Sequence, residues 1–504
     1  MTSITNNVNK KQLKDVVIIG GGPAGMSTAL MLAKRGYAHI TIIEKRPSAD
    51  FYEPDKSFNY MIDGRGQKLT DLLDITEKLA QTSVPSTDFL VTKINAKGER
   101  KTVKLPIIDP NRKTAYWLQR REFVNLLYQE IKQNWQKQIT VLFSAKCLGI
   151  KEIIENKLEV TVQDKEDNIQ TFIPSLLVGC DGLNSLVRKT LNDWSLPISD
   201  RFQMKQFPSP SSGLRYKVLT FPPQFPLSDD DKDQAICNQA YVIRGTFKGQ
   251  DKSISLGLLP LKNPDTPRTA NLITRPHHQL WELKNSEEFY QFFEQAFPHL
   301  PISKIITPEE AERCLQSEGG SFPIPQYCPG CYWLSQDKNT GILLLGDAVH
   351  CFPPDIGQGV NSALEDVYIF DKILSQSDDD LTQALPQYEE KRSPDIYPLI
   401  KLVQTTFPWQ YNQDPLRRQL WNINFFVRLT LSRILPFIFS PPAFILIQNH
   451  HLNYAEIWRR SQRTTFRLWG VIFLLCLLFL GANNLSTSAK IFLYLSIQMR
   501  IAVI

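Results

Sequence analysis

The sequence predicts an α/β protein, in which a Rossmann-like dinucleotide-binding domain is interleaved with an antiparallel-sheet domain and followed by a helical C-terminal region. Three observations lead to this class. Short apolar runs that end in glycine or an acid begin near residues 16, 176 and 341, as in the strands of a parallel sheet. Alternating polar and apolar segments lie between the second and third runs, and helical patterns dominate after residue 371. The 504 residues leave room for two or three domains.

The first apolar run opens the segment on which the nucleotide prediction depends. Val16 to Ile19 suits a buried strand, and Met26 to Arg35 suits the helix that follows it. The glycines of G-x-G-x-x-G between them are Gly20, Gly22 and Gly25. They permit a tight turn, close approach to a pyrophosphate and close packing of helix on strand. A second strand, Ile40 to Ile43, ends in Glu44, whose carboxylate can accept hydrogen bonds from a ribose.

Residues 88 to 119 alternate in polarity and predict antiparallel strands that lead into a helix from Arg121 to Trp135. Arg120 stands at this strand-to-helix junction. Such an arginine can be a plain surface charge or a fork-shaped donor to a pyrophosphate, and we favour the second role for Arg120 more than for Arg121.

The middle of the chain predicts a second sheet. Residues 139 to 178 read as a β-meander that ends in the strand Leu176 to Gly179, and Cys180 to Arg188 follows as an acidic turn and a helix start. Residues 200 to 335, rich in proline, predict a larger antiparallel sheet that forms one wall of a second domain. The acidic run Asp229 to Asp233 is expected to be a solvated loop.

The dinucleotide pattern then returns. Gly341 to Leu345 suits a buried strand, Asp347 follows it, and Gly357 and Gly359 precede a helix that runs through Phe370. A Gly-x-Gly at a helix N-terminus offers unhindered N–H groups and the positive end of the helix dipole. Residues 371 to 460 are expected to be helical.

Composition excludes several classes. The net charge of +6 is small for this length and gives no case for nucleic acid. Only Cys328 and Cys331 form C-x-x-C, with no second pair at zinc-finger spacing, so no metal site is expected. The first fifteen residues are polar, unlike a secretory signal. We therefore expect reduced, intracellular cysteines.

The C-terminal end is apolar. Leu468 to Ala482 carries no charge and follows four arginines, and Ile491 to Ile504 contains one more. A span needs about 20 apolar residues, and basic residues flank the cytoplasmic side of a span. We expect membrane attachment through a transmembrane helix or an in-plane hairpin, with the catalytic part in the cytoplasm. A buried helix at a subunit interface is the alternative. The apolar segment Asn424 to Gln448 can line a bilayer-facing entrance or pack inside.

Three motifs together resemble the fingerprints of the single-component FAD-dependent aromatic hydroxylases. They are GGGPAG with Glu44, CDGLNSLVR from Cys180, and GDAVHCFPPDIGQGVNSALED from Gly346. The resemblance covers most of residues 14 to 400 and implies a glutathione-reductase-type FAD-binding domain. SFNYMIDGRG and YWLQRREF are most similar to segments of the kynurenine 3-monooxygenase branch, with Asp63 in place of a serine. That branch holds its substrate carboxylate with an arginine that has no clear counterpart here.

The resemblance implies bound FAD, with NAD(P)H and O2 as cosubstrates and a C4a-hydroperoxyflavin that hydroxylates an aromatic substrate. Glu44 and the first glycines would bind the ADP half of FAD, while Asp347 and Arg120 would lie near the ribityl and pyrophosphate groups. The candidate catalytic residues are Pro353, Asp355 and His350. The cofactor-binding residues that we expect are Gly20, Gly22, Ala24, Gly25, Glu44, Lys45, Arg46, Arg65, Arg120, Asp181, Gly182, Arg188, Gly346, Asp347, Gly357, Gly359, Val360 and Asn361.

We expect four parts: an FAD-binding domain (14–195 and 336–375, with inserted strands near 88–119), a substrate-domain sheet (196–335), a helical region (376–465) and an apolar membrane-associated C-terminus (466–504). Three other functions stay open. The chain can be a membrane-associated epoxidase or hydroxylase of an isoprenoid or quinone-type lipid. It can be an FAD-dependent dehydrogenase or reductase. It can also be a binding or scaffold subunit, although its fingerprints are intact.

Overall fold

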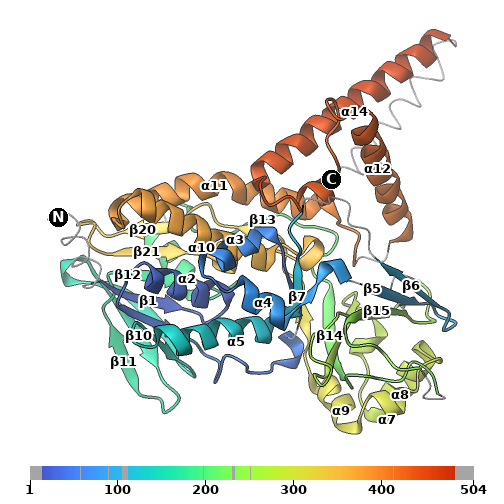
Figure 1. Ribbon diagram of the computed structural model, residues 1–504, viewed down its shortest axis with the longest axis horizontal. Helices are drawn as coiled ribbons and strands as arrows, with labels where there is room; N and C mark the ends of the chain where they lie inside the picture. The colour runs from blue at the N-terminus through green and yellow to red at the C-terminus, as the bar shows by residue number, and fades with distance from the viewer. Residues whose placement is uncertain are drawn as a thin grey trace.

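The computed structural model describes residues 14–482 apart from 57, 89, 105–111, 197, 230–232, 250 and 412–413. Most of the polar N-terminal tail, most of the acidic run Asp229 to Asp233 and the apolar run Ile491 to Ile504 therefore lie outside the described residues. Figure 1 shows a body that contains the first strands and helices of the chain, a second sheet beside it, and a long C-terminal helix that extends away from both. The predicted α/β fold class is confirmed, and the division into domains stays a prediction.

Six strands form the first sheet, in the order β20-β21-β12-β1-β2-β8. They are β1 (Asp15–Ile19), β2 (His39–Ile43), β8 (Ile139–Leu142), β12 (Leu176–Gly179), β20 (Tyr332–Leu334) and β21 (Gly341–Leu344). Neighbours are parallel except β20, which pairs antiparallel with β21. The three apolar runs are thus adjacent strands, so the segments that follow them meet at one edge of the sheet.

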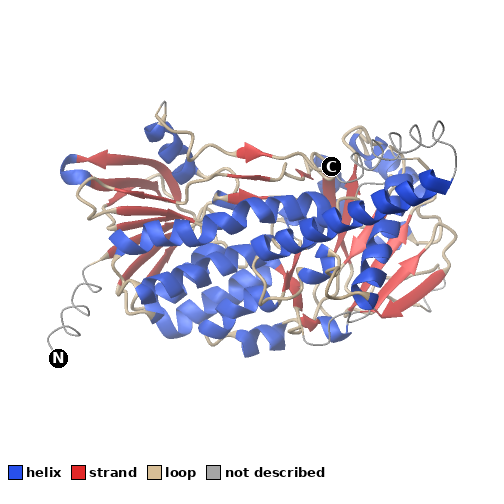
Figure 2. Cartoon of the chain, turned by 90° about the horizontal axis from the view of Figure 1, so that it is seen from above, coloured by secondary structure: helices blue, strands red, loops and turns tan. Residues whose placement is uncertain are grey.

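Helices pack against this sheet or against one another, and the helix that follows β1 is buried without interruption from Ala24 to Ala33. They are α2 (Pro23–Lys34), α3 (Gly64–Leu72), α4 (Thr76–Thr82), α5 (Arg120–Glu130), α6 (Leu186–Ser195), α10 (Gly359–Gln376) and α11 (Leu381–Thr406). The helix predicted to end at Trp135 leaves α geometry after Glu130 and finishes as one π-helical turn. From above, long helices run side by side across the middle of the molecule, with strands at both ends (Figure 2).

The predicted β-meander is wrong in its first strand. β8 joins the parallel sheet beside β2, and a separate antiparallel sheet follows it. That sheet contains β9 (Lys146–Ile153), β10 (Lys157–Gln163) and β11 (Ile169–Phe172). The alternation of polar and apolar residues does not tell a strand of the parallel sheet from one of the antiparallel sheet here, because β8 is only partly buried.

The second sheet has seven strands, in the order β18-β14-β17-β16-β15-β5-β6. They are β5 (Leu90–Ile94), β6 (Arg100–Lys104), β14 (Arg215–Phe221), β15 (Gln239–Arg244), β16 (Ser255–Leu258), β17 (Arg268–Thr274) and β18 (Gly320–Ser321). It is antiparallel as expected, except between β5 and β15. The inserted strands β5 and β6 extend this second sheet.

Three helices that the sequence analysis missed cover the second sheet: α7 (Ser286–Ala296), α8 (Ile302–Ile305) and α9 (Pro308–Gln316). Phe289, Phe292 and Phe293 of α7 pack in a core separate from that of the first sheet. These three residues recur at helical spacing. They lie in residues 200 to 335, which we predicted to contain strands alone because the segment is rich in proline.

Two small three-stranded sheets lie outside these two large sheets. One contains β3 (Asn59–Ile62), β4 (Val84–Pro85) and β7 (Tyr116–Gln119), and the other β13 (Lys205–Gln206), β19 (Gln326–Tyr327) and β22 (His350–Cys351). β7 pairs with β3 and leads directly into α5. The strand predicted before Arg120 is therefore present.

The helical C-terminal region contains α12 (Pro415–Ile434), α13 (Ala443–Leu446) and α14 (Tyr454–Ala482). Among the residues that the structure describes, no helix has both the length and the apolarity needed to cross a membrane, so the predicted transmembrane helix is not supported there. The first half of α14 carries four arginines, and Leu468 to Ala482 has 15 residues, fewer than the about 17 that a span needs.

Candidate functional site

The first fingerprint packs tightly against the second at the edge of the parallel sheet. A Cβ atom at Gly25 would lie 1.9 Å from the Gly20 carbonyl oxygen, and one at Gly20 would lie 2.3 Å from that of Cys180. At Gly22, by contrast, no atom lies within 4 Å of that position. The turn is thus closed toward the protein and open on its other side, as a phosphate-binding turn must be.

Glu44 is buried beside this turn with both carboxylate oxygens in use. Oε2 accepts a hydrogen bond from the Gly21 N–H at 2.7 Å, and Oε1 accepts one from the Arg46 N–H at 2.8 Å. Oε1 also lies 3.5 Å from the Arg46 guanidinium, so Oε2 is the oxygen that keeps a lone pair for a ribose hydroxyl. The Arg46 guanidinium also pairs with Glu53, and Lys45 is exposed. Of these three predicted residues, Glu44 has the geometry of a nucleotide ligand.

Asp347 lies close to surrounding protein but keeps an accessible surface. Desolvation by that protein raises the pKa of its carboxyl, against the charges of His350 and Arg120, which lower it. The carboxylate is therefore flanked by protein without being covered. Tyr60, which was not predicted, lies close by: burial raises its pKa, and the charge of Arg120 and a hydrogen bond from it act against that rise.

The second fingerprint, from Cys180, is hydrogen-bonded to the third, from Gly346. Asp181 Oδ2 accepts hydrogen bonds from the N–H groups of Leu186 and Val187 at the start of α6, at 2.6 and 3.3 Å, while its Oδ1 is buried without a partner. The Arg188 guanidinium donates to the carbonyl oxygens of Ala348 and Leu183, both at 2.8 Å. Arg188 therefore fixes the turn after β21, and Gly182 at φ +81° lets the chain reverse before α6.

The third fingerprint completes the edge. A Cβ atom at Gly346 would lie 3.5 Å from that of Ala24, which brings the first and third fingerprints into contact. In the 357–361 turn, the Asn361 amide donates to the Met61 and Gly357 carbonyl oxygens at 2.8 and 3.0 Å. Gly359 has no atom within 4 Å of its Cβ position, and Val360 is buried. The N-terminus of α10 thus faces open space, where its dipole favours negative charge.

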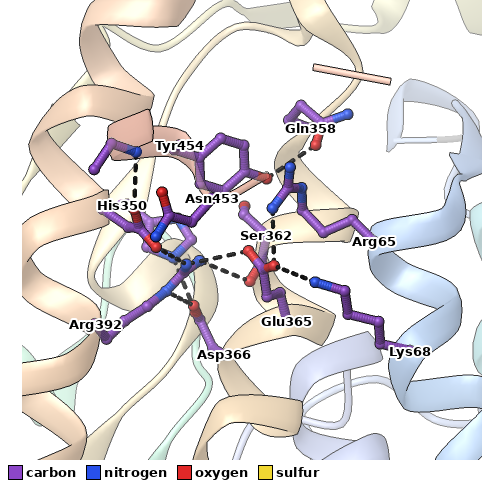
Figure 3. A network of polar contacts seen from close by, with 12 residues as sticks. Arg65, Lys68, His350, Gln358, Ser362, Glu365, Asp366, Arg392, Asn453 and Tyr454 are labelled. Atoms are coloured by element: carbon purple, nitrogen blue, oxygen red, sulfur yellow. Dashed lines mark hydrogen bonds and ion pairs between the residues drawn. The ribbon is translucent and has the colours of Figure 1, made fainter. Parts of the chain in front are cut away.

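Two predicted site residues lie in a buried charge network instead (Figure 3). His350 Nε2 is 2.9 Å from Asp366 Oδ2, and Arg65 donates to Glu365 Oε1 at 2.8 Å. Arg65 is fully buried and His350 is 1% exposed. Their side-chain partners are therefore the two carboxylates of α10, although the charge of His350 also lowers the pKa of Asp347.

The same network holds Arg392, which the sequence analysis missed. Burial alone would raise the pKa of Glu365, but the charges of Arg65 and Arg392 lower it. The pKa of Asp366 is lowered in the same way by His350 and Arg392. These carboxylates stay ionised inside the protein because cations surround them.

Asp355 has an unused polar atom, as does His350, whose Nδ1 is also buried without a partner. Asp355 follows Pro353 and is 1% exposed, its Oδ1 accepts a hydrogen bond from Ser211 Oγ at 2.6 Å, and its Oδ2 is buried without a partner. Burial raises the pKa of Asp355 to about 7, although the hydrogen bond from Ser211 lowers it. Such a carboxyl can gain or lose a proton near neutral pH.

Several residues at the site were not predicted: Tyr60, Ser211, Gln358 and Arg392. Gln358 lies between the two glycines of the quoted third motif, so its position was a usable signal. Ser211 and Arg392 lie in segments without a local pattern, and their partners Asp355 and Asp366 lie on other elements.

The parallel sheet, the glycine turn, the acid after the second strand and the open N-terminus of α10 define a nucleotide-binding flavoprotein. The family described as FAD binding domain matches residues 14–201 and 334–400. The chain belongs to this family. FAD is therefore its cofactor. The Glu44 carboxylate suits a ribose hydroxyl, and the open side of the glycine turn and the Arg120 guanidinium suit a pyrophosphate.

Similar proteins agree with this assignment. The chain is 25% identical over 401 residues to a kynurenine 3-monooxygenase from Candida albicans, covering 77% of this chain and 78% of that protein. It is 20% identical over 467 residues to that of Sus scrofa, with 90% and 87% covered. The probable FAD-dependent monooxygenase pqsL from Pseudomonas aeruginosa shares its fold, with a TM-score of 0.53, 17% identity and coverage of 82% of this chain and 99% of that one. The chain is an FAD-dependent monooxygenase.

Substitution of Gly25 by alanine tests the closed side of the glycine turn. The added Cβ would clash with the Gly20 carbonyl oxygen, so the turn must move, and we expect FAD affinity to fall roughly tenfold or more. Gly149→Ala is the matched control, because no atom lies within 4 Å of its Cβ position. Titration of FAD-free protein followed by flavin fluorescence measures both. Equal affinity of Gly25→Ala and Gly149→Ala would contradict the assignment.

Proposed function

We propose that this chain is an NAD(P)H- and O2-dependent monooxygenase that hydroxylates a small aromatic substrate. The observation that carries the proposal is the arrangement at one edge of the parallel sheet, where the open side of the glycine turn, the accessible Asp347 beside Arg120 and Tyr60, and the open N-terminus of α10 meet. These groups offer the hydrogen-bond donors and acceptors that a flavin nucleotide needs, and the flavin supplies the chemistry.

Bound FAD supplies the redox chemistry, taking electrons from NAD(P)H and passing them to O2. The chain positions that group. Glu44 would accept hydrogen bonds from the adenosine ribose, and the Arg120 guanidinium would pair with a phosphate. The N-terminus of α10 would stabilise negative charge that develops on the flavin ring. No protein nucleophile is needed for this chemistry.

We place the substrate between the FAD-binding body and the substrate-domain sheet of residues 196–335. Asp355 lies on the body and Ser211 on the segment that leads into β14, so their hydrogen bond joins the two. Tyr411 is close enough for the charge of Asp355 to raise its pKa, after burial, and its ring contacts Phe322 at 5.4 Å between centroids. Aromatic rings around one buried carboxyl suit an aromatic substrate that donates an N–H or O–H.

The names of the similar proteins suggest which substrates to test first. Two of them are kynurenine 3-monooxygenases, and a solved structure of PqsL contains 2-aminobenzoylacetate. We propose kynurenine or a related aromatic compound as the substrate. Asp355 would accept a hydrogen bond from an N–H or O–H group of that substrate.

A second candidate function rests on the outer face of α12. Of the twenty residues of this helix, only Ser432 is buried. The exposed apolar side chains of the outer face recur at helical spacing: Leu416, Leu420, Ile423, Phe426, Val427 and Ile434. Phe437, just after the helix, is 96% exposed. An apolar stripe of this kind needs a partner.

The charge around this face favours an anionic membrane surface. From Pro415 to Leu475 the chain carries eight arginines and a single acidic residue, Glu456. An amphipathic helix with a basic flank lies in the plane of anionic bilayers. We propose that α12 docks there. Such docking would also bring a lipid-phase substrate, of isoprenoid or quinone type, within reach.

Oxygen uptake decides between the functions. With NADPH or NADH and L-kynurenine, the purified protein should consume one O2 per nicotinamide oxidised and form a product heavier by one oxygen atom. Uptake that only a quinone-type or isoprenoid lipid stimulates would move the substrate to the lipid class. Flavin reduction without O2 consumption for any substrate would instead indicate a dehydrogenase or reductase.

Asp355→Asn should change how stability depends on pH. The folded pKa of Asp355, about 7, lies above its unfolded value, so the folded state binds the extra proton and wild-type stability falls as pH rises from about 4 to about 7. The variant lacks this loss and should gain melting temperature relative to wild type over that range. Hydrogen bonds from Ser335 and Asn339 lower the pKa of the exposed Asp337. The wild type gains this carboxylate's contribution to stability as the pH rises to about 5, so Asp337→Asn should show a constant deficit relative to wild type between about pH 5 and 7. A difference between Asp355→Asn and wild type that also stays constant over that range would refute the assignment.

Vesicle co-sedimentation tests the outer face of α12. The wild-type chain should bind vesicles that contain anionic lipid, less tightly at high salt. Ile423→Glu with Phe426→Glu should weaken binding roughly tenfold, because two charges enter the apolar contact. Ile154→Glu is the control, since Ile154 is 89% exposed on the hairpin between β9 and β10. Unchanged binding of the double variant would remove α12 as the contact.

A further inference from the structure

The first residue of the C-terminal helix reaches the 357–361 turn. The Tyr454 hydroxyl donates a hydrogen bond to Gln358 Oε1 at 2.9 Å, across 96 positions of the sequence. Tyr454 is fully buried and Gln358 is 1% exposed (Figure 3). Burial also raises the pKa of Tyr454 well above its usual range, so the hydroxyl keeps its proton and remains a donor.

Gln358 also contacts the residue that caps the N-terminus of α3. Its Nε2 donates to Asp63 Oδ2 at 2.8 Å, while Asp63 Oδ1 accepts the Arg65 N–H at the start of α3. The amide is therefore held at both ends, with its oxygen toward Tyr454 and its nitrogen toward Asp63. The neighbours of Gln358 are Gly357 and Gly359, which have no side chain to anchor the backbone. Gln358 therefore anchors the centre of the turn, as Asn361 anchors its end.

Tyr454 is itself held firmly. Its ring lies between two guanidinium groups, with Arg65 at 4.1 Å and Arg392 at 5.7 Å from the ring centroid. Arg65 also donates to the Leu452 carbonyl oxygen at 2.7 Å, and the Ala455 N–H donates to Asp395 Oδ1 at 2.8 Å. The start of α14 is therefore fixed to α3 and α11 and moves only with them.

We propose that Tyr454 is a positioning residue for the flavin, acting through Gln358, so that the C-terminal helix is part of the cofactor site. This inference rests on the proposed function only in taking the 357–361 turn as the segment against the flavin ring. Loss of the hydroxyl would leave the buried Gln358 oxygen unpaired. The turn would then relax, and its N–H groups would no longer point where charge develops on the ring.

Tyr454→Phe tests the proposal because it keeps the ring between the two arginines and removes the hydroxyl alone. We expect FAD to bind roughly tenfold more weakly, with a shifted visible absorption and circular dichroism spectrum of the bound flavin. Tyr241→Phe is the matched control, since the Tyr241 hydroxyl accepts the Ile236 N–H at 2.8 Å in the core of the second sheet. That control should keep the wild-type affinity and spectrum.

A double-variant cycle tests the route through Gln358. If Tyr454 acts through that amide, Tyr454→Phe should add little to the loss of FAD affinity already caused by Gln358→Met. Fully additive losses would show that Tyr454 acts elsewhere. Wild-type affinity and spectrum for Tyr454→Phe would reduce Tyr454 to a packing residue.

Amide hydrogen exchange of the FAD-free protein gives a readout that needs neither cofactor nor substrate. Residues 357–361 should exchange faster in Tyr454→Phe than in wild type, while the strands of the second sheet stay unchanged. Equal exchange in the turn overturns the inference. Failure of wild type to hydroxylate any substrate would sink the proposed function and leave these binding, spectral and exchange results interpretable.

Discussion

Two adjacent carboxylates on α10, Glu365 and Asp366, hold the nucleotide-binding body together. Glu365 binds Arg65 of α3 and Arg392 of α11, at 2.8 and 3.2 Å. Asp366 binds Arg392, His350 and the backbone N–H that opens the third fingerprint. Because these contacts radiate from two neighbouring residues, segments more than 300 positions apart in the sequence take fixed places around the cofactor site.

The cost of burying these charges explains the rigidity of this arrangement. Removing one partner of a buried ion pair typically costs about 3–5 kcal/mol, since the other charge is left uncompensated. The network therefore favours one geometry strongly. Outside the charge network, Asp347 and the N–H groups at the start of α10 face open space. The network holds these polar groups in place, and they remain available to a ligand. Tyr454 connects this network to α14 through its contacts with Gln358 and Arg65. The apolar outer face of α12 is not part of the network.

Short sequence patterns predicted much of the fold but fewer of the contacts at the site. Gly25 and Glu44 act through neighbours within 25 residues, so a motif predicts their geometry. Arg65 and His350 also stand in motifs, but their partners Glu365 and Asp366 compensate them from α10, and no short pattern separates such an arginine from a cofactor ligand. The helix α7 was missed because the helical spacing of Phe289, Phe292 and Phe293 lies in a proline-rich segment. β8 was misplaced because partner strands are chosen by tertiary contacts.

Parallel titration of the FAD-free protein with FAD and FMN tests the central claim most directly. The glycine turn and Glu44 would contact the pyrophosphate and the adenosine ribose of FAD, and FMN lacks the adenosine and one of the two phosphates. The account predicts one FAD per chain, bound at least about 100-fold more tightly than FMN. Equal affinities, or folded protein that binds neither, would contradict it.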